Sequence, residues 1–419
     1  MSTSTLITSR SEAPRRRSKG RRWLLVVVFM VIGIPVVVLL AACLIYPPTY
    51  VFRVAGWGEA DVADYQRFPA RSVRASGKPY YFKQALDEGR IRSLFKQAGQ
   101  DNLQAFLADT GTQAFLVIQD DTILYEGYFN GATRDSVVTS FSMAKSFTSA
   151  LIGIAIAEGD IASVDDPITQ YLPELAERDR RFAAITIRDL LRMSSGIRYE
   201  EFPFLNGDDA KTYYYPNLRH LALRDTEIVD VPGTSFLYNN YHPLLLGMIL
   251  ERATRMPVVT YLQEKIWKPI DMEFDGSWSL DSTTSGFEKM ESGINGRAID
   301  FAKFGRLFLN DGNWNGRQVV PAAWVAESTR PDDGGTSDEY YPDVPELADD
   351  RQYYGYLWWG WRRGTASYDF AARGNHGQFI YVAPAKKLII VRHGERFGTS
   401  VAEWNELFYK VASTIEPPR

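Results

Sequence analysis

Two side chains that can act together on an acyl group lie three residues apart, at Ser142 and Lys145. A serine hydroxyl becomes a nucleophile when a neighbouring base takes its proton. Residues three apart are neighbours on a helix. The segment 141–158 is apolar nearly all round, which predicts a buried helix with Ser140 as its N-cap and Gly159 as its stop. The pattern predicts a nucleophile at a buried helix start, where the helix dipole favours developing negative charge.

The same spacing occurs at Ser93 and Lys96, so the spacing alone does not identify the nucleophile. Ser93 lies in a polar stretch, whereas Ser142 follows two strand-like runs and opens the most apolar helix of the chain. A lysine on a wholly buried helix needs a partner or a lowered pKa. Context therefore favours Ser142 over Ser93 as the nucleophile, while an ordinary serine at a helix N-terminus beside a surface lysine stays open as the alternative.

Tyr238 and Asn240 form a second candidate pair, with a phenol that can move a proton and an amide that can orient a lysine or a carbonyl group. Tyr238 follows Pro-Gly-Thr and precedes an apolar helix, which predicts a rigid elbow between layers. Without Ser142, a packing role for this ring would be favoured. The same Tyr-x-Asn spacing, without this context, occurs at Tyr128-Phe129-Asn130 and Tyr215-Pro216-Asn217.

Composition excludes several other chemistries. The formal net charge of -4 does not favour nucleic-acid binding, which needs a basic surface. The single cysteine, Cys43, excludes an internal disulfide and a cysteine-based metal cluster. The four histidines have no metal-ligand spacing, so we expect neither a metal nor a cofactor.

An apolar segment over residues 23–46 predicts a transmembrane anchor, because about 20 apolar residues span a bilayer as a helix. The basic tail, residues 1–22, predicts a cytoplasmic N-terminus and an extracytoplasmic location for the rest, attached to the cytoplasmic membrane. A cleaved signal peptide is disfavoured because the run is too long. Leu40-Ala-Ala-Cys43 leaves lipidation of Cys43 open.

The remaining pattern predicts a juxtamembrane arm over 47–100 and one domain over 101–419. Apolar runs on either side of Asp120-Asp121-Thr122 indicate a β-hairpin. A helical subdomain is expected over about 160–290, strands over 368–392 and a last helix over 400–413. This order predicts an α/β (α+β) fold in which an antiparallel sheet is flanked by helices.

The order Ser142-x-x-Lys145, Tyr238-x-Asn240 and a late strand motif resembles class C β-lactamases and related esterases. The likeness covers roughly residues 112–393 and implies the β-lactamase/transpeptidase-like fold. Longer strings also resemble that family: Leu190-Leu-Arg-Met-Ser-Ser-Gly-Ile, residues 232–247, Asp300-Phe-Ala-Lys-Phe-Gly-Arg-Leu, and Gly374-Asn-His-Gly-Gln-Phe-Ile-Tyr-Val.

The third motif of the family, Lys-Thr-Gly or His-x-Gly, falls here on Asn375-His376-Gly377. The cationic first position is lost, which argues against efficient β-lactam hydrolysis unless His376 or Arg373 replaces it. The variant is similar to the branch of 6-aminohexanoate-oligomer hydrolases, which cleave amides and carboxyl esters. That resemblance also points to Tyr199 as a substrate-contacting residue, with a core tyrosine as the alternative.

The resemblance implies that Ser142 attacks an acyl carbonyl group, with its proton passing to Lys145 or Tyr238. The backbone N–H groups of Ser142 and Gln378 would form the oxyanion hole. Which residue is the base stays open. Trp358-Trp359-Gly360-Trp361 is interpreted either as core or as a wall of the acyl site.

Three alternatives remain for the function. A Ser-His-Asp hydrolase would use His376, but the Gly-x-Ser-x-Gly elbow is missing. A non-catalytic module would bind envelope peptides, and a true β-lactamase or D-Ala peptidase would share the same motifs. The motifs predict a small-molecule or peptide-like acyl substrate without identifying it, and they leave the oligomeric state open.

Overall fold

The computed structural model describes residues 19–203, 206–331, 340–341, 347, 351–365 and 367–418. The chain divides into two compact units. The first ends at Trp57, and the second covers Gly58–Arg419. Most of the predicted arm (47–100) therefore belongs to the second unit. Most of the predicted basic tail (1–22) lies outside the described residues.

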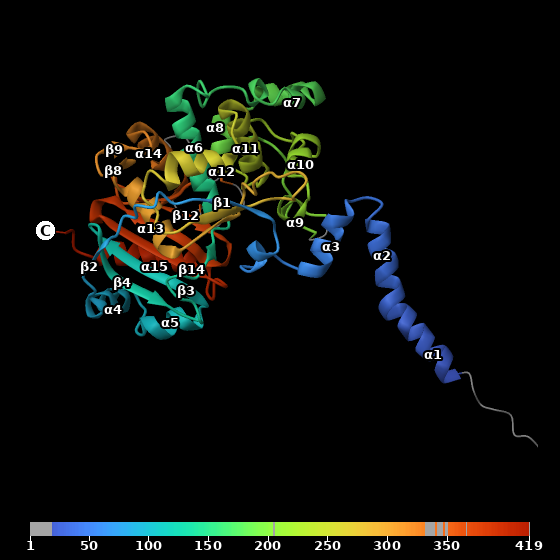
Figure 1. Ribbon diagram of the computed structural model, residues 1–419, viewed down its shortest axis with the longest axis horizontal. Coiled ribbons are helices and arrows are strands. Elements are labelled where there is room, and N and C mark those ends of the chain that lie inside the picture. Colours follow the sequence, from blue (N-terminus) through green and yellow to red (C-terminus); the bar gives the residue numbers. More distant parts are fainter. Residues whose placement is uncertain are drawn as a thin grey trace, which may run out of the picture. The chain divides into compact units, whose positions relative to one another are not determined.

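An eight-stranded sheet forms the centre of the second unit, in the order β10-β11-β12-β13-β14-β3-β4-β2 (Figure 1). All neighbours are antiparallel except β2 and β4, which are parallel. The mixed α/β architecture is thus confirmed, with this one parallel pair as an exception to the prediction. The strands are β2 (Lys83–Gln84), β3 (Thr112–Gln119), β4 (Thr122–Tyr128), β10 (Gln352–Tyr354), β11 (Trp359–Arg362), β12 (Tyr368–Gly374), β13 (Gln378–Ala383) and β14 (Leu388–Gly394).

The predicted hairpin is confirmed as β3 and β4, joined at Asp120 and Asp121. Both aspartates have positive φ, 48° and 60°, which suits the tight turn between twisted strands. The Asp121 carboxylate accepts two hydrogen bonds of 2.7 Å from the Arg306 guanidinium, so the hairpin is tied to helix α13 (Ala298–Leu309).

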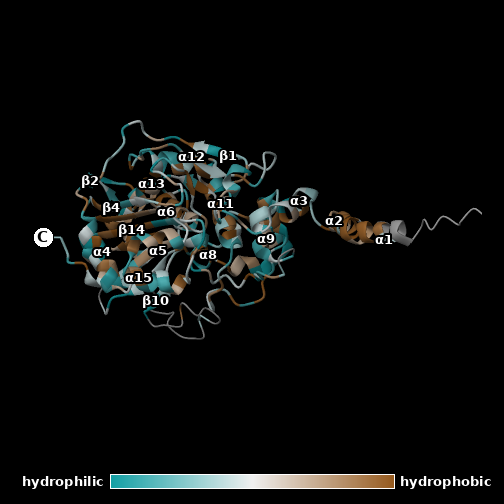
Figure 2. Cartoon of the chain, turned by 90° about the horizontal axis from the view of Figure 1, so that it is seen from below, coloured by the Kyte–Doolittle hydropathy of each residue, from teal (hydrophilic) through white to brown (hydrophobic). Residues whose placement is uncertain are grey.

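Helices cover both faces of this sheet. Helix α6 (Met143–Glu158) and α13 lie on one face, and a Cβ at Gly305 of α13 would meet Ile380 and Ile389 of the sheet within 3.0 Å. On the other face lie α4 (Glu88–Gln97), α5 (Leu103–Asp109) and α15 (Val401–Thr414). The α15 ring of Phe408 lies 5.4 Å from that of Phe379 on β13. Figure 2 shows that the strands and α6 in the interior are mainly apolar, as a buried layer requires.

The helical layer expected over about 160–290 is present between α6 and α13. Its helices include η3 (Ile168–Gln170), α7 (Pro173–Arg178), η4 (Arg180–Ala184), α8 (Ile187–Leu191), α9 (Asp208–Tyr214), α10 (Leu218–Arg224), α11 (Tyr241–Thr254), α12 (Val258–Leu262) and η5 (Gln263–Trp267). The sequence pattern missed a second sheet, which has the order β1-β6-β7-β5. Its strands are β1 (Ala70–Val73), β5 (Val138–Thr139), β6 (Gly276–Ser279) and β7 (Ile294–Gly296). They are too short to show a clear period of two.

Shorter elements complete the second unit. They are η2 (Asp64–Gln66), the hairpin β8 (Asn313–Trp314) with β9 (Arg317–Gln318), α14 (Ala322–Thr329), η6 (Asn375–Gly377) and η7 (Pro384–Lys386). The expected strands over 368–392 are confirmed as β12, β13 and β14. Ser400 caps α15 through a capping box with Glu403, so the last helix begins as the sequence predicts.

The structure does not support the predicted transmembrane helix over residues 23–46. The segment is divided into α1 (Lys19–Val28), the π-helix η1 (Phe29–Gly33) and α2 (Ile34–Ala42), and α3 (Pro48–Trp57) follows. A π-helix interrupts the regular hydrogen-bond pattern of an α-helix, so the apolar residues are shared among shorter elements. Across the part of the chain that the structure describes, no helix has both the length and the apolar character needed to cross a membrane. The predicted extracytoplasmic location stays a prediction.

Candidate active site

The start of helix α6 presents Ser142 in a way that the sequence did not predict. Helix α6 begins at Met143 with Ser142, not Ser140, at its N-cap, because Phe141 has a φ of 42° and cannot continue the helix. The Ser140 hydroxyl instead donates to the Phe141 carbonyl and accepts from the N–H of Ile294 on β7. The Ser142 hydroxyl makes no capping bond. It is therefore available for chemistry at the end of the helix.

Lys145 lies directly beside this hydroxyl. Its Nζ is 2.8 Å from Ser142 Oγ and donates over 2.9 Å to the main-chain carbonyl of Glu291. Only 1% of the lysine is exposed. The buried amine therefore has hydrogen-bond partners, as expected for a lysine on a buried helix, and the geometry allows proton exchange between Lys145 and Ser142.

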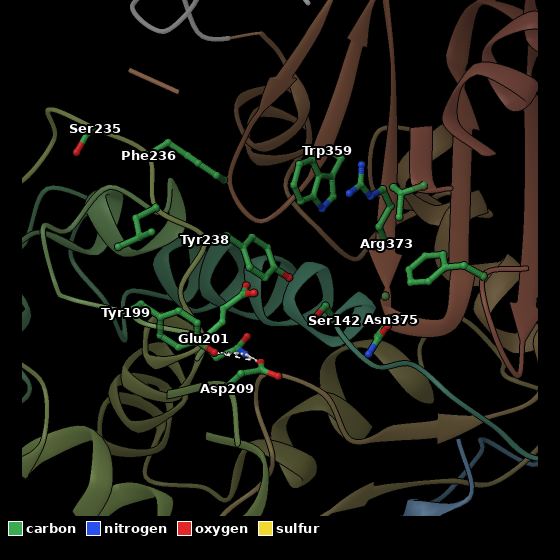
Figure 3. A pocket seen from close by; sticks show the side chains of 15 residues that line it. Ser142, Tyr199, Glu201, Asp209, Ser235, Phe236, Tyr238, Trp359, Arg373 and Asn375 are labelled. Carbon is green, nitrogen blue, oxygen red and sulfur yellow. Dashed lines mark hydrogen bonds between the residues drawn. The ribbon is translucent and has the colours of Figure 1, made fainter. Parts of the chain in front are cut away.

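Tyr238 approaches the same amine from the loop before α11. The centre of its ring lies 5.0 Å from Lys145 Nζ. The ring stacks on Trp359 of β11 at 5.8 Å and meets the edge of Tyr354 at 6.3 Å. Figure 3 shows the phenol hydroxyl directed toward the Ser142 side of the pocket. The structure thus brings together the serine, the lysine and the tyrosine that the sequence singled out.

Asn240 forms a small polar network with Tyr199 and Asp209. Its Nδ2 donates to the Tyr199 hydroxyl over 2.8 Å and to Asp209 Oδ1 over 3.1 Å, and the Tyr199 hydroxyl donates to the same carboxylate over 3.2 Å. Asn240 therefore orients Tyr199 and Asp209 here, rather than Lys145. Its own Oδ1 is buried and has no hydrogen-bond partner among the residues that the structure describes, and the residue lines the pocket.

Desolvation by the surrounding protein affects the acidic groups of this wall. The Asp209 side chain is open to the cavity, but desolvation raises the pKa of its carboxyl group, while the hydrogen bond from Tyr199 and the charge of Lys145 oppose the rise. Partial burial and the nearby Asp209 also raise the pKa of Glu201. The pKa of Tyr199 lies well above its ordinary value because the phenol is buried.

The cavity has a volume of about 750 Å³ and opens above Ser142. Tyr199, Glu201 and Asp209 come from the helical layer, and Trp359 and Arg373 come from strands β11 and β12 (Figure 3). All three tryptophans of the cluster are buried, and Trp359 is the one that also lines the pocket. The other lining residues are Ser235, Phe236, Leu237, Tyr238, Asn240, Gly374, Asn375, Phe397 and Val401.

The third motif is distributed around the site rather than gathered in it. Asn375 lines the pocket, and its Oδ1 accepts from the N–H of His376. The His376 ring lies 5.0 Å from Phe141, and its Nε2 is 2.8 Å from the Ala60 carbonyl oxygen. His376 is therefore held by the N-terminal arm and is not among the residues that line the pocket. This placement does not favour a Ser-His-Asp site built on His376.

Gly377 and Gln378 follow the lining residue Asn375 and lead into strand β13. Gly377 has a φ of 78°, and the buried Gln378 side chain donates to the Gly394 carbonyl over 2.6 Å. The side chain of Gln378 is thus bound to strand β14 and is not among the residues that line the pocket. Gly374, the register partner of Gln378, lies against the Ser142 loop, where a Cβ would come within 2.3 Å of the Ser140 carbonyl oxygen. This contact sets the distance between the strand edge and the nucleophile.

Sequence reasoning missed Glu201, Asp209 and Glu291, because acidic residues in loops and short helices carry no spacing signal. Among the described residues, no group of three or more histidine, cysteine and acidic side chains is placed to hold a metal ion.

Comparison with known proteins agrees with this geometry. The beta-lactamase family model matches residues 100–407. The chain belongs to the beta-lactamase family. It is 28% identical over 326 residues to the 6-aminohexanoate-dimer hydrolase of Paenarthrobacter ureafaciens, covering 73% of this chain and 78% of that protein.

Solved structures show the same fold. A putative 6-aminohexanoate-dimer hydrolase from Bacillus anthracis has a TM-score of 0.69 at 24% identity, covering 82% of this chain and 89% of its own. A class C beta-lactamase has a TM-score of 0.57 at 17% identity, covering 80% and 99%. The recognition of the family from its motifs is therefore confirmed.

Proposed function

We propose that this protein is a serine hydrolase that cleaves a carboxyl ester or an amide through a covalent acyl-enzyme on Ser142. The observation that carries the proposal is the 2.8 Å contact between Lys145 Nζ and Ser142 Oγ at the floor of the cavity. A buried amine next to an uncapped serine is the arrangement in which a hydroxyl can be activated. The relatedness to a 6-aminohexanoate-dimer hydrolase supports the same reaction class.

In the first step, Ser142 Oγ bonds to the acyl carbon and its proton passes to Lys145 or to Tyr238. The tetrahedral intermediate then collapses, the bond to the alcohol or amine breaks, and the same pair returns the proton to the leaving group. Water hydrolyses the acyl-enzyme by the reverse sequence of proton transfers. The N–H groups of Ser142 and Gln378 stabilise the oxyanion in both halves of the reaction.

The pocket favours an open-chain ester or amide over a β-lactam as the substrate. Asn375, which is neutral, lies where related β-lactamases carry a cation, and the acidic side chains of Glu201 and Asp209 are on the wall formed by the helical layer. These carboxylates would repel an anionic drug and would accept a substrate with donor or cationic groups on that side. Arg373, which stacks 3.7 Å from the Trp359 ring, is the cationic side chain among the described lining residues.

Intact-mass spectrometry of the full chain after treatment with a fluorophosphonate tests the proposal. We expect one adduct on the wild type and none on Ser142→Ala. The matched control is Ser93→Ala, because Ser93 repeats the Ser-x-x-Lys spacing, while its hydroxyl accepts a hydrogen bond from the Gln97 side chain in α4. It should retain the adduct. A folded wild type without an adduct would instead favour a non-catalytic binding module.

A further inference from the structure

Arg392 on strand β14 is a fully buried cation that the reaction proposed above does not use. None of its surface is exposed. Its Nη1 donates to the carbonyl oxygens of Gly377 over 2.6 Å and His376 over 3.3 Å. On the other side, Nη2 donates to the carbonyl groups of Thr110 and Arg396, and Nε donates to Thr112 Oγ1, each over 3.0 Å. The guanidinium thus links the turn at Asn375–Gly377, next to the active site, to the start of β3.

No carboxylate among the described residues is paired with this guanidinium, whose partners are carbonyl oxygens, one hydroxyl and the ring of Trp404 at 4.2 Å. Burial, followed by the charge of Arg396, lowers the pKa of Arg392 to about 9. The side chain is therefore still charged at neutral pH. Burying a cation without a counter-ion among the described residues is costly, so packing alone does not explain the presence of Arg392 at this position.

Two glycines make room for this group. A Cβ at Gly377 would lie 2.0 Å from Arg392 Nη1, and one at Gly394 would lie 2.5 Å from the same atom. The side chain of Gln378 fixes the other end of the turn, because its amide donates to the Gly394 carbonyl over 2.6 Å and accepts from the Gly394 N–H over 3.2 Å. Strand β14 therefore holds both the turn and the residue that follows it.

The shortest hydrogen bond of Arg392, 2.6 Å from Nη1, is accepted by the carbonyl oxygen of Gly377. The Gly377 carbonyl and the Gln378 N–H belong to the same planar peptide unit. A donor fixed on that carbonyl determines the direction of the N–H, and it draws electron density away from the N–H, which strengthens the hydrogen bond that this N–H can donate. The positive charge behind the peptide also favours negative charge in front of it.

We propose that Arg392 is a positioning residue that orients and polarises the Gly377–Gln378 peptide for the oxyanion of the reaction at Ser142. The inference rests on the proposed function, because it assigns the Gln378 N–H to the oxyanion hole. Arg392 acts only through this peptide, from behind the turn. Its loss therefore weakens a contact made mainly in the transition state, which lowers the rate of the chemical step more than the affinity for the ground state.

The test measures how fast the fluorophosphonate modifies Ser142 in the full chain, as the separate constants kinact and KI, together with thermal unfolding. Arg392→Met keeps the length and loses the charge and the donors, while Arg392→Lys keeps a charge with fewer donors. Thr112→Val is the matched control, because it removes a bond of the same guanidinium on the side away from the turn.

We expect kinact to fall about 100-fold in Arg392→Met, near the lower limit for losing one oxyanion donor, with KI changed less than about threefold. Arg392→Lys should lie in between, and Thr112→Val should lower the melting temperature with kinact within about threefold of the wild type. Equal kinact values in a folded Arg392→Met and the wild type would overturn this inference alone. Failure of both arginine variants to fold would assign Arg392 to stability only and would also overturn it. An unmodified wild type would overturn the proposed function, and this inference with it.

Discussion

The amine of Lys145 lies between two oxygens, 2.8 Å from Ser142 Oγ and 2.9 Å from the carbonyl oxygen of Glu291. The first contact is local, one turn along α6, while the second comes from the chain just before β7. Glu291 is itself held by Lys289, whose Nζ is 2.7 Å from its carboxylate, with both side chains buried. The position of the amine is thus fixed by the helix and by the second sheet together.

Replacing Lys145 by methionine should abolish rapid acylation of Ser142. Methionine fills a similar volume but cannot exchange a proton with the hydroxyl, so we expect the burst of p-nitrophenol from p-nitrophenyl acetate to slow by about 1000-fold, within the range for a general acid–base group. Stopped-flow absorbance measures the burst. Lys96→Met, at the second Ser-x-x-Lys site, should leave the burst unchanged. A burst of wild-type rate in Lys145→Met would show that this amine is not required.

Tyr238→Phe should reduce kcat by about 100-fold or more, because the ring and its stacking on Trp359 remain while the proton-carrying hydroxyl is lost. Steady-state hydrolysis of the same ester gives kcat and KM. The matched control is Tyr128→Phe. Tyr128 begins another Tyr-x-Asn sequence, in the β3–β4 hairpin, where its phenol donates to Glu126 over 2.6 Å. If both phenylalanine variants kept full activity, Lys145 alone would accept the proton from Ser142 and return it to the leaving group.

The sequence predicted these residues because local patterns carry them. An apolar run that contains one lysine predicts a buried helix whose lysine amine has a partner, and the tandem aspartates at 120 and 121 predict a tight hairpin. The N-cap was predicted wrongly, because Phe141 has a positive φ and the helix begins only after it. Ser140 is bonded to Ile294 across 154 positions. No local pattern contains that information.

Contacts between distant segments also explain what the sequence missed at the site. His376 was a candidate substrate or catalytic residue, but its partner is the carbonyl of Ala60, 316 positions away. Asp209 reaches the pocket because Tyr199 and Asn240 hold it there.

The N-terminal apolar run is a different case. Residues 23–46 satisfied the hydropathy criterion for a transmembrane helix, yet the α-helix is interrupted by a π-helix at Phe29–Gly33. Composition alone does not encode such an interruption.

His376→Ala separates the proposed mechanism from a histidine-based one. The ring contacts Phe141 and Ala60 rather than Ser142, so we expect kcat to fall by less than about 10-fold. In a Ser-His-Asp enzyme, removing the histidine base costs several orders of magnitude. Ester hydrolysis at saturating substrate distinguishes these results. A loss above about 1000-fold in a folded variant would return His376 to a catalytic role.

Gly374→Ala should impair acylation although it changes no reactive group. The added Cβ would lie 2.3 Å from the Ser140 carbonyl oxygen and 3.1 Å from the Ser142 nitrogen, so the nucleophile loop must move away from the strand edge. A displacement of about 1 Å can cost about 100-fold in rate. The fluorophosphonate labelling rate reports the effect. Gly89→Ala, where the nearest atom to a new Cβ is 3.9 Å away, is the control and should label at the wild-type rate.

We expect the buried His242 of α11 to make the stability of the domain depend on pH. Its Nε2 is 2.6 Å from Ser195 Oγ, and burial, with a smaller contribution from the charge of Lys145, lowers its pKa to about 3. Burial likewise lowers the pKa of His393 to about 3. Both histidines are neutral in the folded protein at pH 5, whereas in the unfolded chain they take up protons near pH 6.5.

The unfolded state therefore binds more protons between about pH 6.5 and 3, and the free energy of unfolding must fall as the pH is lowered through this range. The contribution of each histidine is complete above pH 6.5 and has a slope of up to about 1.4 kcal/mol per pH unit below it. Urea unfolding at pH 7, 6, 5 and 4 measures the slope. His242→Gln should reduce the slope by the contribution of one proton. Ser195→Ala keeps the imidazole and removes its partner, so it should lower stability by a similar amount at every pH. A His242→Gln variant with the wild-type slope would show that His242 does not contribute to the acid sensitivity.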